Sequence, residues 1–295
     1  MALLSPAGRR IALVSRDEEL DSLLACRRIA AHLDELTPVH GLSEPPDVAL
    51  VCDDEAVTEE LLERDVPVVQ LSSAHRITPP PCPAGRALRR LHRPGWLPGP
   101  WPEHHGVRAT GALAPARLSR KRQRSGTLML LSLWDVAEHE AEAFAAGPLR
   151  ALVRAAVHRT GHCEVVCDTR LPAARAALDG IGSVWATRAA DVDVDALHAD
   201  AEVFLAAPVL GALALAQARR APLVFLPPLG PVQRDLCERV TRTVPVPVVT
   251  DPGDPSVWAP PAGDGPWRTL DPALDDLRGA QRVARSLRQL SLAPL

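Results

Sequence analysis

Short, continuous apolar runs alternate with segments of helical period along most of the chain. In the first half the runs are 11-IALVS-15, 48-VALVC-52 and 66-VPVVQL-71, and helical spacing of apolar residues appears over 20–36 and 58–64. Strands that are buried on both faces read as continuous apolar runs, and intervening helices allow such strands to pair in parallel. The first half is therefore predicted to form a parallel α/β domain.

The same alternation begins again at 127-TLMLLSL-133 and continues to the end of the chain. A final segment from Leu274 onward places its apolar residues on one face at helical spacing, which predicts an amphipathic helix that packs onto one or both domains. The second half is predicted to be a second α/β domain with six strands. The further candidate strands are 164–168, 183–187, 202–206, 222–228 and 246–250, and the candidate helices are 135–158, 171–178, 211–219 and 233–242.

A proline-rich region separates the two patterns. Residues 73–115 are dense in Pro, Gly, Arg and Trp, which is typical of loop and edge structure. The basic run 117-RLSRKRQRSG-126 is interpreted as a solvated linker. The predicted organisation is an N-terminal domain at 1–116, a linker at 117–126 and a C-terminal domain at 127–295. Two tandem Rossmann-like domains imply a ligand cleft between them, beyond the carboxyl ends of the strands.

Composition narrows the classes of partner. The 295 residues carry 33 basic and 36 acidic side chains, a formal charge of -3, so no nucleic acid or anionic membrane is expected as partner. No apolar stretch offers about 20 uninterrupted residues for a membrane span, and the first residues lack an export signal, so a cytoplasmic protein is expected. Six scattered cysteines indicate reduced thiols rather than a disulfide scaffold.

The order of elements resembles the GT-B-type glycosyltransferases, especially the group that includes the N-acetylglucosamine transferase of lipid II synthesis and the macrolide glycosyltransferases. In the first half, 47–72 is similar to a family stretch in which an Asp-led strand precedes a helix and a "gvPvv" strand, and 107-VRATGAL-113 is similar to the segment before the linker. In the second half, 200–233 is similar to the donor-binding region. The resemblance implies binding of a nucleotide-diphosphate sugar, with no further cofactor, and transfer of the sugar to a small acceptor.

The resemblance also implies which residues hold the donor. A glycine turn at a helix N-terminus lets backbone N–H groups approach a diphosphate, and the corresponding residues here are Gly211, Ala212 and Leu213. Gln233 corresponds to a residue that contacts the donor sugar. Other family positions have changed: a ribose-binding Glu is replaced by Leu215, and the Asp and Asn that flank the sugar-contacting Gln are replaced by Val232 and Leu236.

An inverting transferase also needs a base near the acceptor hydroxyl. The family loop after the first strand often carries a His, whereas this chain has 16-RDEELDS-22. Asp17, Glu18 and Asp21 are candidate bases there, with stabilisation of a helix N-terminus as the alternative role. His75 follows the strand at 66–71 and is a further candidate, with a structural role in a loop as its alternative.

Other catalytic motifs do not account for the chain. Cys163 and Cys167 in one strand would stand about 13 Å apart at roughly 3.3 Å per residue, so no metal site is expected. Walker-type, nucleophile-elbow and zincin motifs do not occur. Three functions follow: a nucleotide-sugar transferase, a non-catalytic partner or regulator of a motif-complete enzyme, or a cleft adapted to another small metabolite. A partner enzyme or a homodimer is compatible with the second.

Overall fold

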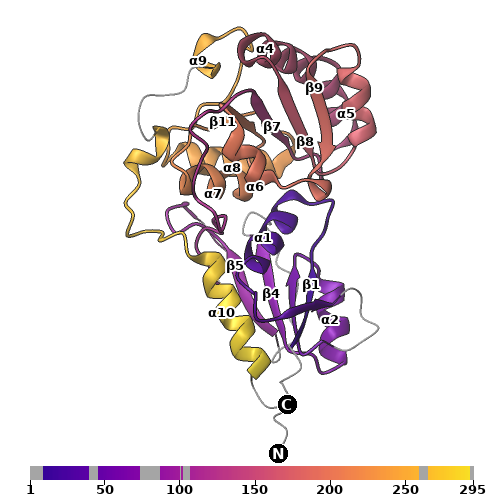
Figure 1. The fold of residues 1–295 in the computed structure, drawn as a ribbon, viewed down its shortest axis with the longest axis vertical. Helices are drawn as coiled ribbons and strands as arrows, with labels where there is room; N and C mark the ends of the chain where they lie inside the picture. Colours follow the sequence, from indigo (N-terminus) through magenta and orange to yellow (C-terminus); the bar gives the residue numbers. More distant parts are fainter. Residues whose placement is uncertain are drawn as a thin grey trace, which may run out of the picture.

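The computed structural model describes residues 9–39, 46–73, 87–99, 101, 107–258 and 265–292, and within them the chain forms two α/β units, each built on one parallel sheet (Figure 1). This confirms the predicted fold class. The first sheet has the strand order β2-β1-β3-β4-β5-β6, and the second has the order β11-β10-β7-β8-β9. Every named strand pair is parallel.

The strands of both sheets are short and their central members are fully buried, which is why their sequences are continuous apolar runs. In β3 and β7 all five residues are buried. The first sheet consists of β1 (Arg10–Val14), β2 (Thr37–Val39), β3 (Val48–Cys52), β4 (Val68–Ser73), β5 (Ala87–His92) and β6 (Arg108–Ala109). The second consists of β7 (Thr127–Leu131), β8 (Cys163–Cys167), β9 (Val184–Arg188), β10 (Val203–Ala206) and β11 (Val224–Phe225).

Helices connect successive strands and supply the other half of each hydrophobic core. The first unit contains α1 (Leu20–Ala30) and α2 (Glu55–Glu63). The second contains α3 (Glu138–Phe144), a π-helical turn (Ala145–Leu149), α4 (Arg150–Thr160), α5 (Leu171–Leu178), a 3-10 turn (Ala189–Asp191), α6 (Val194–Asp200), α7 (Leu210–Ala218), α8 (Gly230–Thr241), α9 (Pro255–Trp258) and a 3-10 turn (Gly265–Thr269). The C-terminal helix is α10 (Gly279–Leu292).

Helix α10 returns to the first unit (Figure 1). Its apolar face, which includes Val283, Ala284 and Leu287, shares one buried cluster with Ile11 of β1 and Leu50 of β3. The sequence predicted the amphipathic face correctly. The residues of α10 fall in the 127–295 segment that was proposed as the second domain. The helix packs, however, against the first sheet.

Two segments differ from the sequence-based expectation. Residues 87–92 fall in the region interpreted as loop and edge, yet they form β5, which pairs with β4 over six positions. Its arginines are tolerated because they have partners: Arg89 forms an ion pair with Glu55 at 3.0 Å, and Arg90 donates to Ser286 Oγ of α10 at 3.3 Å. Conversely, 246–250 makes only an isolated bridge between Val248 and Phe225, since Pro247 carries no N–H for a ladder.

The two units are joined by a buried cation. Arg28 of α1 forms an ion pair with Asp195 at the start of α6, with 2.7 Å between Nη2 and Oδ1, and is only 2% exposed. It also donates to the carbonyl oxygens of Leu113 and Gly211, each at 3.0 Å. One guanidinium therefore connects α1 to the segment before the linker and to two elements of the second unit.

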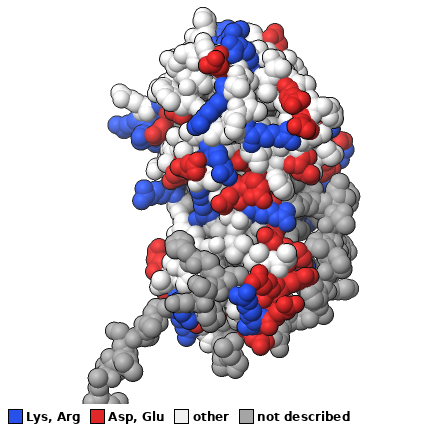
Figure 2. Space-filling view, turned by 90° about the vertical axis from the view of Figure 1, so that its right-hand side faces the viewer, with Lys and Arg blue, Asp and Glu red and all other residues white. Residues whose placement is uncertain are grey.

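Charges of both signs are interspersed on the face shown in Figure 2. Within the described ranges, no helix is both long and apolar enough to cross a bilayer.

Candidate functional site

Strand order locates the default ligand site of each unit. In chain order the second sheet is arranged 5-4-1-2-3, the Rossmann arrangement, and its strand order reverses between β7 and β10. The first sheet reverses between β1 and β3. Ligands of open parallel sheets bind beyond the carboxyl ends of the strands at these switch points. The segments involved are 15–19 and 53–54 in the first unit, and 132–136 and 207–209 in the second.

Both switch points meet at the junction of the two units, where Asp21 of α1 contacts the N-terminus of α7. One carboxylate oxygen accepts the backbone N–H of Leu210 at 3.0 Å, and the other accepts that of Gly211 at 2.7 Å. Asp21 is 3% exposed. The N–H groups of a first helical turn have no partner within the helix and carry the positive end of its dipole, so they favour an anion. In this chain the anion is Asp21.

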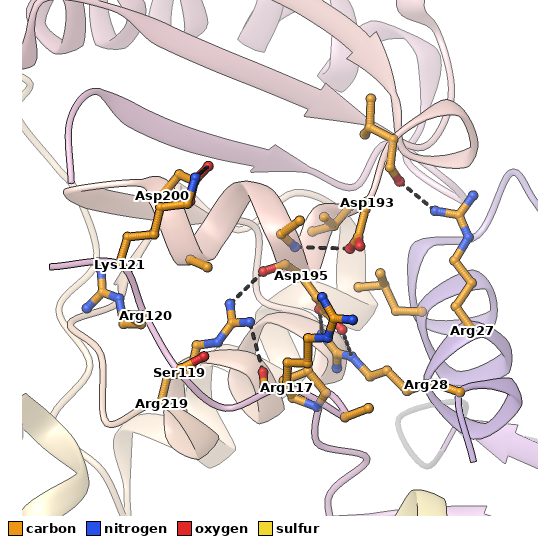
Figure 3. Close-up of a pocket in the computed structure, with 18 of the residues that line it drawn as sticks. Arg27, Arg28, Arg117, Ser119, Arg120, Lys121, Asp193, Asp195, Asp200 and Arg219 are labelled. Carbon is orange, nitrogen blue, oxygen red and sulfur yellow. Dashed lines mark hydrogen bonds and ion pairs between the residues drawn. The ribbon is translucent and has the colours of Figure 1, made fainter. Parts of the chain in front are cut away.

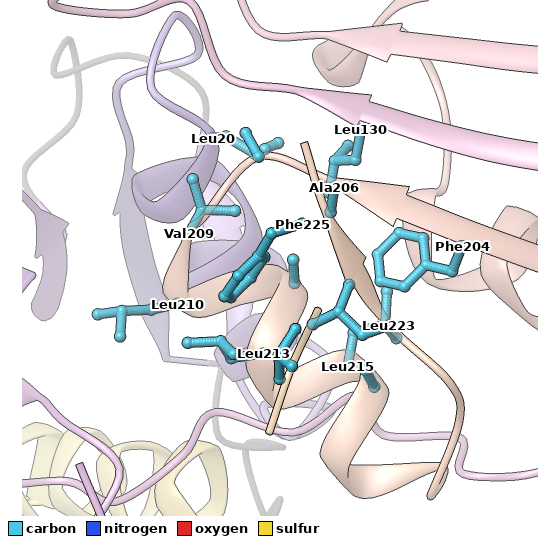
Figure 4. Packing of buried hydrophobic residues seen from close by; sticks show 14 of the residues in the cluster. Leu20, Leu130, Phe204, Ala206, Val209, Leu210, Leu213, Leu215, Leu223 and Phe225 are labelled. Atoms are coloured by element: carbon cyan, nitrogen blue, oxygen red, sulfur yellow. The ribbon is translucent and has the colours of Figure 1, made fainter. Parts of the chain in front are cut away.

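Gly211 is needed for the close approach of these helices. A Cβ at this position would lie 2.6 Å from Cδ1 of Leu24 and 3.2 Å from Oδ1 of Asp21. The resemblance gave Gly211 a role in the approach of a diphosphate, whereas in this structure the adjacent space is filled by α1. Ala212 and Leu213, the other expected diphosphate-binding residues, are fully buried in the hydrophobic cluster beneath the site (Figure 4).

A small cavity of about 50 Å³ lies beside this contact. Gln233 lines it and is itself bound to the protein, because Nε2 donates to the carbonyl oxygen of Ser132 at 2.7 Å and Oε1 accepts the N–H of Leu229 at 3.0 Å. These bonds fix the loop after β7 against the start of α8. The remaining lining residues are Glu19, Leu20, Asp21, Trp134, Asp135, Val136, Pro208, Val209, Gly230 and Val232.

The loop after β7 is held in place by a second buried carboxylate. Asp168, at the end of β8, accepts Oγ–H of Ser132 and the N–H of Leu133, both at 2.8 Å. Burial raises the pKa of Asp168, and the hydrogen bonds from Leu133 and Ser132 oppose that effect. Asp168 positions the cavity wall and does not line the cavity.

The candidate bases are placed differently from one another. Asp17 is exposed and accepts the hydroxyl of Ser15 at 3.2 Å, and Glu18 is half-buried; neither lines the cavity. Glu19 and Asp21, from the same acidic run, do line it. His75 lies outside the described residues.

Sequence reasoning did not single out Glu19, Ser132 or Asp135 as site residues, although all three line the cavity. A detectable signal existed for two of them. Ser132 and Asp135 directly follow a strand at the switch point of the second sheet, where the strand order reverses. Glu19 was hidden by its neighbours, because four of the five residues from Asp17 to Asp21 are acidic and nothing in their order tells which of them faces the junction.

The residues that replace the donor-binding side chains of the resemblance are part of the core. Leu215 is fully buried and Leu236 is 1% exposed, and both belong to the cluster formed with Phe204 and Phe225 (Figure 4). They fill space in the interior, and neither lines the cavity.

The fold and this junction define a two-domain, Rossmann-like α/β protein. The family described as "CGA synthase-related protein" matches residues 11–295, and the chain belongs to that family. Among curated proteins no significant match is found.

Solved structures of glycosyltransferases are similar to nearly the whole chain. The spinosyn rhamnosyltransferase SpnG is 16% identical, with 97% of this chain and 96% of that chain covered and a TM-score of 0.49. The calicheamicin glycosyltransferase CalG4 is 16% identical, with coverage of 93% and 79% and a TM-score of 0.49. The glycosyltransferase SnogD from Streptomyces nogalater is 14% identical, with coverage of 96% and 95% and a TM-score of 0.45.

Proposed function

We propose that this chain is a non-catalytic member of its family, which uses the two-domain scaffold to bind and regulate a transferase that has kept its donor-binding residues. The observation that carries this proposal is the contact of Asp21 with the N–H groups of Leu210 and Gly211. These amides are the groups that a GT-B-like protein would offer to a donor diphosphate. A carboxylate of the chain itself already satisfies them.

Space and charge at the junction support the same conclusion. Pockets for small molecules and cofactors enclose roughly 300–1,000 Å³, whereas the cavity beside Asp21 encloses about 50 Å³. Glu19, Asp21 and Asp135 line it, and like charges at short range repel a diphosphate. Among the described residues that line this cavity, none carries a basic side chain to offset them.

A surface suited to a partner is present on the second sheet. Strand β9 is the outer strand of that sheet, and Trp185 on it is 51% exposed. Unpaired strand edges favour association with another chain, and aromatic residues are enriched in interfaces. This edge is proposed as the contact with the transferase.

Nucleotide binding tests the first half of the proposal. Purified protein is heated with uridine, thymidine, guanosine and adenosine diphosphates and their sugar conjugates, since a ligand that binds only the folded state raises its Tm. The proposal expects that none of these compounds slows hydrogen exchange in peptides covering 207–213 at the start of α7. A clear, saturable shift that is accompanied by protection of 207–213 would contradict it.

Complex formation tests the second half. The tagged chain is expected to co-purify with a transferase that retains the donor-binding Glu and Asp-Gln residues, and to change the turnover of that enzyme when the purified proteins are mixed. Trp185→Ala is expected to weaken the complex. Leu292→Ala is the control: it truncates an apolar side chain that is 65% exposed but lies on α10, and it is expected to leave the complex intact. Recovery of the chain alone, or equal effects of the two variants, argues against the partner role.

The second candidate is a transferase, and one observation favours it. Two neighbouring amides at the start of α7 converge on a single anion, which is the geometry that binds phosphate at a helix N-terminus. A donor would have to replace Asp21 as the two units move apart. In that case a nucleotide sugar protects 207–213 of the wild type from hydrogen exchange and the protein transfers the sugar, both of which the non-catalytic proposal forbids.

A further inference from the structure

A second cavity lies at the junction and shares no lining residue with the one beside Asp21. We propose that this cavity binds a phosphorylated small molecule, with Arg117, Arg120 and Arg219 as the phosphate-binding residues. The proposal goes beyond the function given above, because it assigns this chain a ligand of its own at a different place.

The cavity has the size of a small-molecule site. It encloses about 790 Å³, within the range of roughly 300–1,000 Å³ that such sites occupy. Its walls are the C-terminal half of α1, the segment 115–121 that includes the start of the linker, the segment 190–200 that includes α6, and Arg219 at the end of α7 (Figure 3). Both units and the linker therefore contribute to it.

Basic side chains outnumber acidic ones on the walls, and three of the four acidic ones have partners. Asp195 is paired with Arg28 at 2.7 Å, Asp200 is paired with Lys121 at 2.8 Å, and Asp193 accepts the N–H of Ala196 at 3.0 Å. The basic lining residues are Arg27, Arg28, Arg117, Arg120, Lys121 and Arg219, and the acidic ones are Asp191, Asp193, Asp195 and Asp200.

Within the described part of the chain, no carboxylate forms an ion pair with Arg117, Arg120 or Arg219. Arg120 donates to the carbonyl oxygen of Ala201 at 2.8 Å, and Arg219 donates to that of Asp195 at 2.6 Å. The Nε atoms of Arg120 and Arg219 are buried without a hydrogen-bond partner. Arg219 Nη2 also donates to the carbonyl oxygen of Arg117 at 3.0 Å. Arg120 and Arg219 thus each carry a charge that no carboxylate pairs with and one Nε–H group without a partner.

Positive charges are crowded around Arg120 in this cavity, and this crowding affects its pKa. Burial, together with the nearby Arg124 and Arg219, lowers the pKa of Arg120 to about 10. The imidazole of His198, which lies 3.0 Å from Nη1 of Arg219, adds no compensating charge. An anion between the arginines would relieve their mutual repulsion and accept their free donors.

Phosphate is the anion that this arrangement fits best. Arginine presents a planar fork of donors that matches phosphate oxygens, and three arginines from two different segments line this one cavity. Apolar residues of the wall, including Leu24, Pro115 and Val194, provide a surface for an organic moiety. The four aspartates disfavour an extended nucleic-acid backbone, which needs a continuous basic track.

Titration calorimetry with pyrophosphate and with adenosine diphosphate tests the proposal on the full chain. Arg117 is exposed, and among the described residues its side chain forms no hydrogen bond or ion pair, so Arg117→Glu is the main variant. Arg154→Glu, at an exposed position of α4 away from the cavity, makes the same change of charge and is the matched control. Circular dichroism checks that both variants are folded.

The expected result is saturable binding of at least one of the two probes to the wild type, weakened about tenfold, or roughly 1.4 kcal/mol, in Arg117→Glu and unchanged in Arg154→Glu. Binding of pyrophosphate assigns recognition to the phosphate groups alone, and binding of the nucleotide only shows that the organic part contributes. No binding of either probe, or a change of less than fivefold in Arg117→Glu, overturns the proposal.

Hydrogen exchange locates the bound probe. The proposal expects slower exchange in peptides covering 115–121 and 190–200. Protection confined to 207–213 would place the phosphate at the N-terminus of α7 instead; that result overturns this inference and also contradicts the non-catalytic proposal.

Discussion

Removal of the Asp21 carboxylate is the perturbation whose effect follows most directly from the structure. Asp21→Ala deletes two hydrogen bonds, of 3.0 and 2.7 Å, to the backbone of α7. A hydrogen bond to a charged group contributes about 1.5–3 kcal/mol, and two that share one carboxylate are less than additive. The expected loss is about 3 kcal/mol of unfolding free energy. At roughly 2–4 °C per kcal/mol for units of this size, the Tm falls by about 6–12 °C.

Two further variants calibrate that number in the same thermal melt. Asp21→Asn keeps one acceptor oxygen, so about half of the loss is expected. Asp17→Ala removes a neighbouring carboxylate that is exposed, and its effect stays within about 0.5 kcal/mol. The reasoning is refuted if Asp21→Ala melts within about 2 °C of the wild type, or if Asp17→Ala loses as much stability.

A ligand can then be tested as a replacement for the missing side chain. If Asp21 stands where a phosphate would bind, thymidine diphosphate is expected to recover part of the lost Tm in Asp21→Ala and to raise the Tm of this variant by more than that of the wild type, because only the variant has free amides at α7. Equal shifts in both proteins would show that Asp21 does not occupy the nucleotide site.

Three further predictions follow from buried groups. Arg28→Ala should lower the unfolding free energy by about 3–5 kcal/mol in urea denaturation, because it leaves Asp195 unpaired at the junction, whereas Arg242→Ala, in an exposed pair, costs under about 1 kcal/mol. Burial lowers the pKa of His198 well below the ordinary 6.5, so below that pH only the unfolded state binds the proton and the free energy of unfolding falls. Between about pH 5 and 6.5 the free energy of unfolding of the wild type should therefore change with pH by up to about 1.4 kcal/mol per pH unit. His198→Gln should flatten this curve, and parallel curves for the two proteins would contradict the prediction. Leu215→Glu should unfold the second unit or melt far below the wild type without gaining nucleotide binding, because position 215 is inside the core, and a folded variant that binds nucleotide would refute that placement.

The two-domain fold is readable from the sequence because strands such as β3 and β7 are buried on both faces and must be apolar throughout. Strand β5 was not recognisable, since its arginines depend on Glu55 and Ser286, which are distant in sequence. The same limit applies to the site. The acidic run after β1 was identified, but the selection of Asp21 depends on α7, which begins 189 residues later.

The return of α10 to the first unit means that the chain crosses the junction twice, and the crossings run side by side. Leu113 and Arg278 form an antiparallel bridge, and Gly279 donates to the carbonyl oxygen of Ala112 at 3.1 Å. The carboxylate of Asp275 accepts the N–H of Ala112 at 2.9 Å. The second unit is thus an insertion within the first, and the two chain crossings that connect it are hydrogen-bonded to each other. A proteolytic cut in either crossing alone therefore leaves the halves attached through the other crossing.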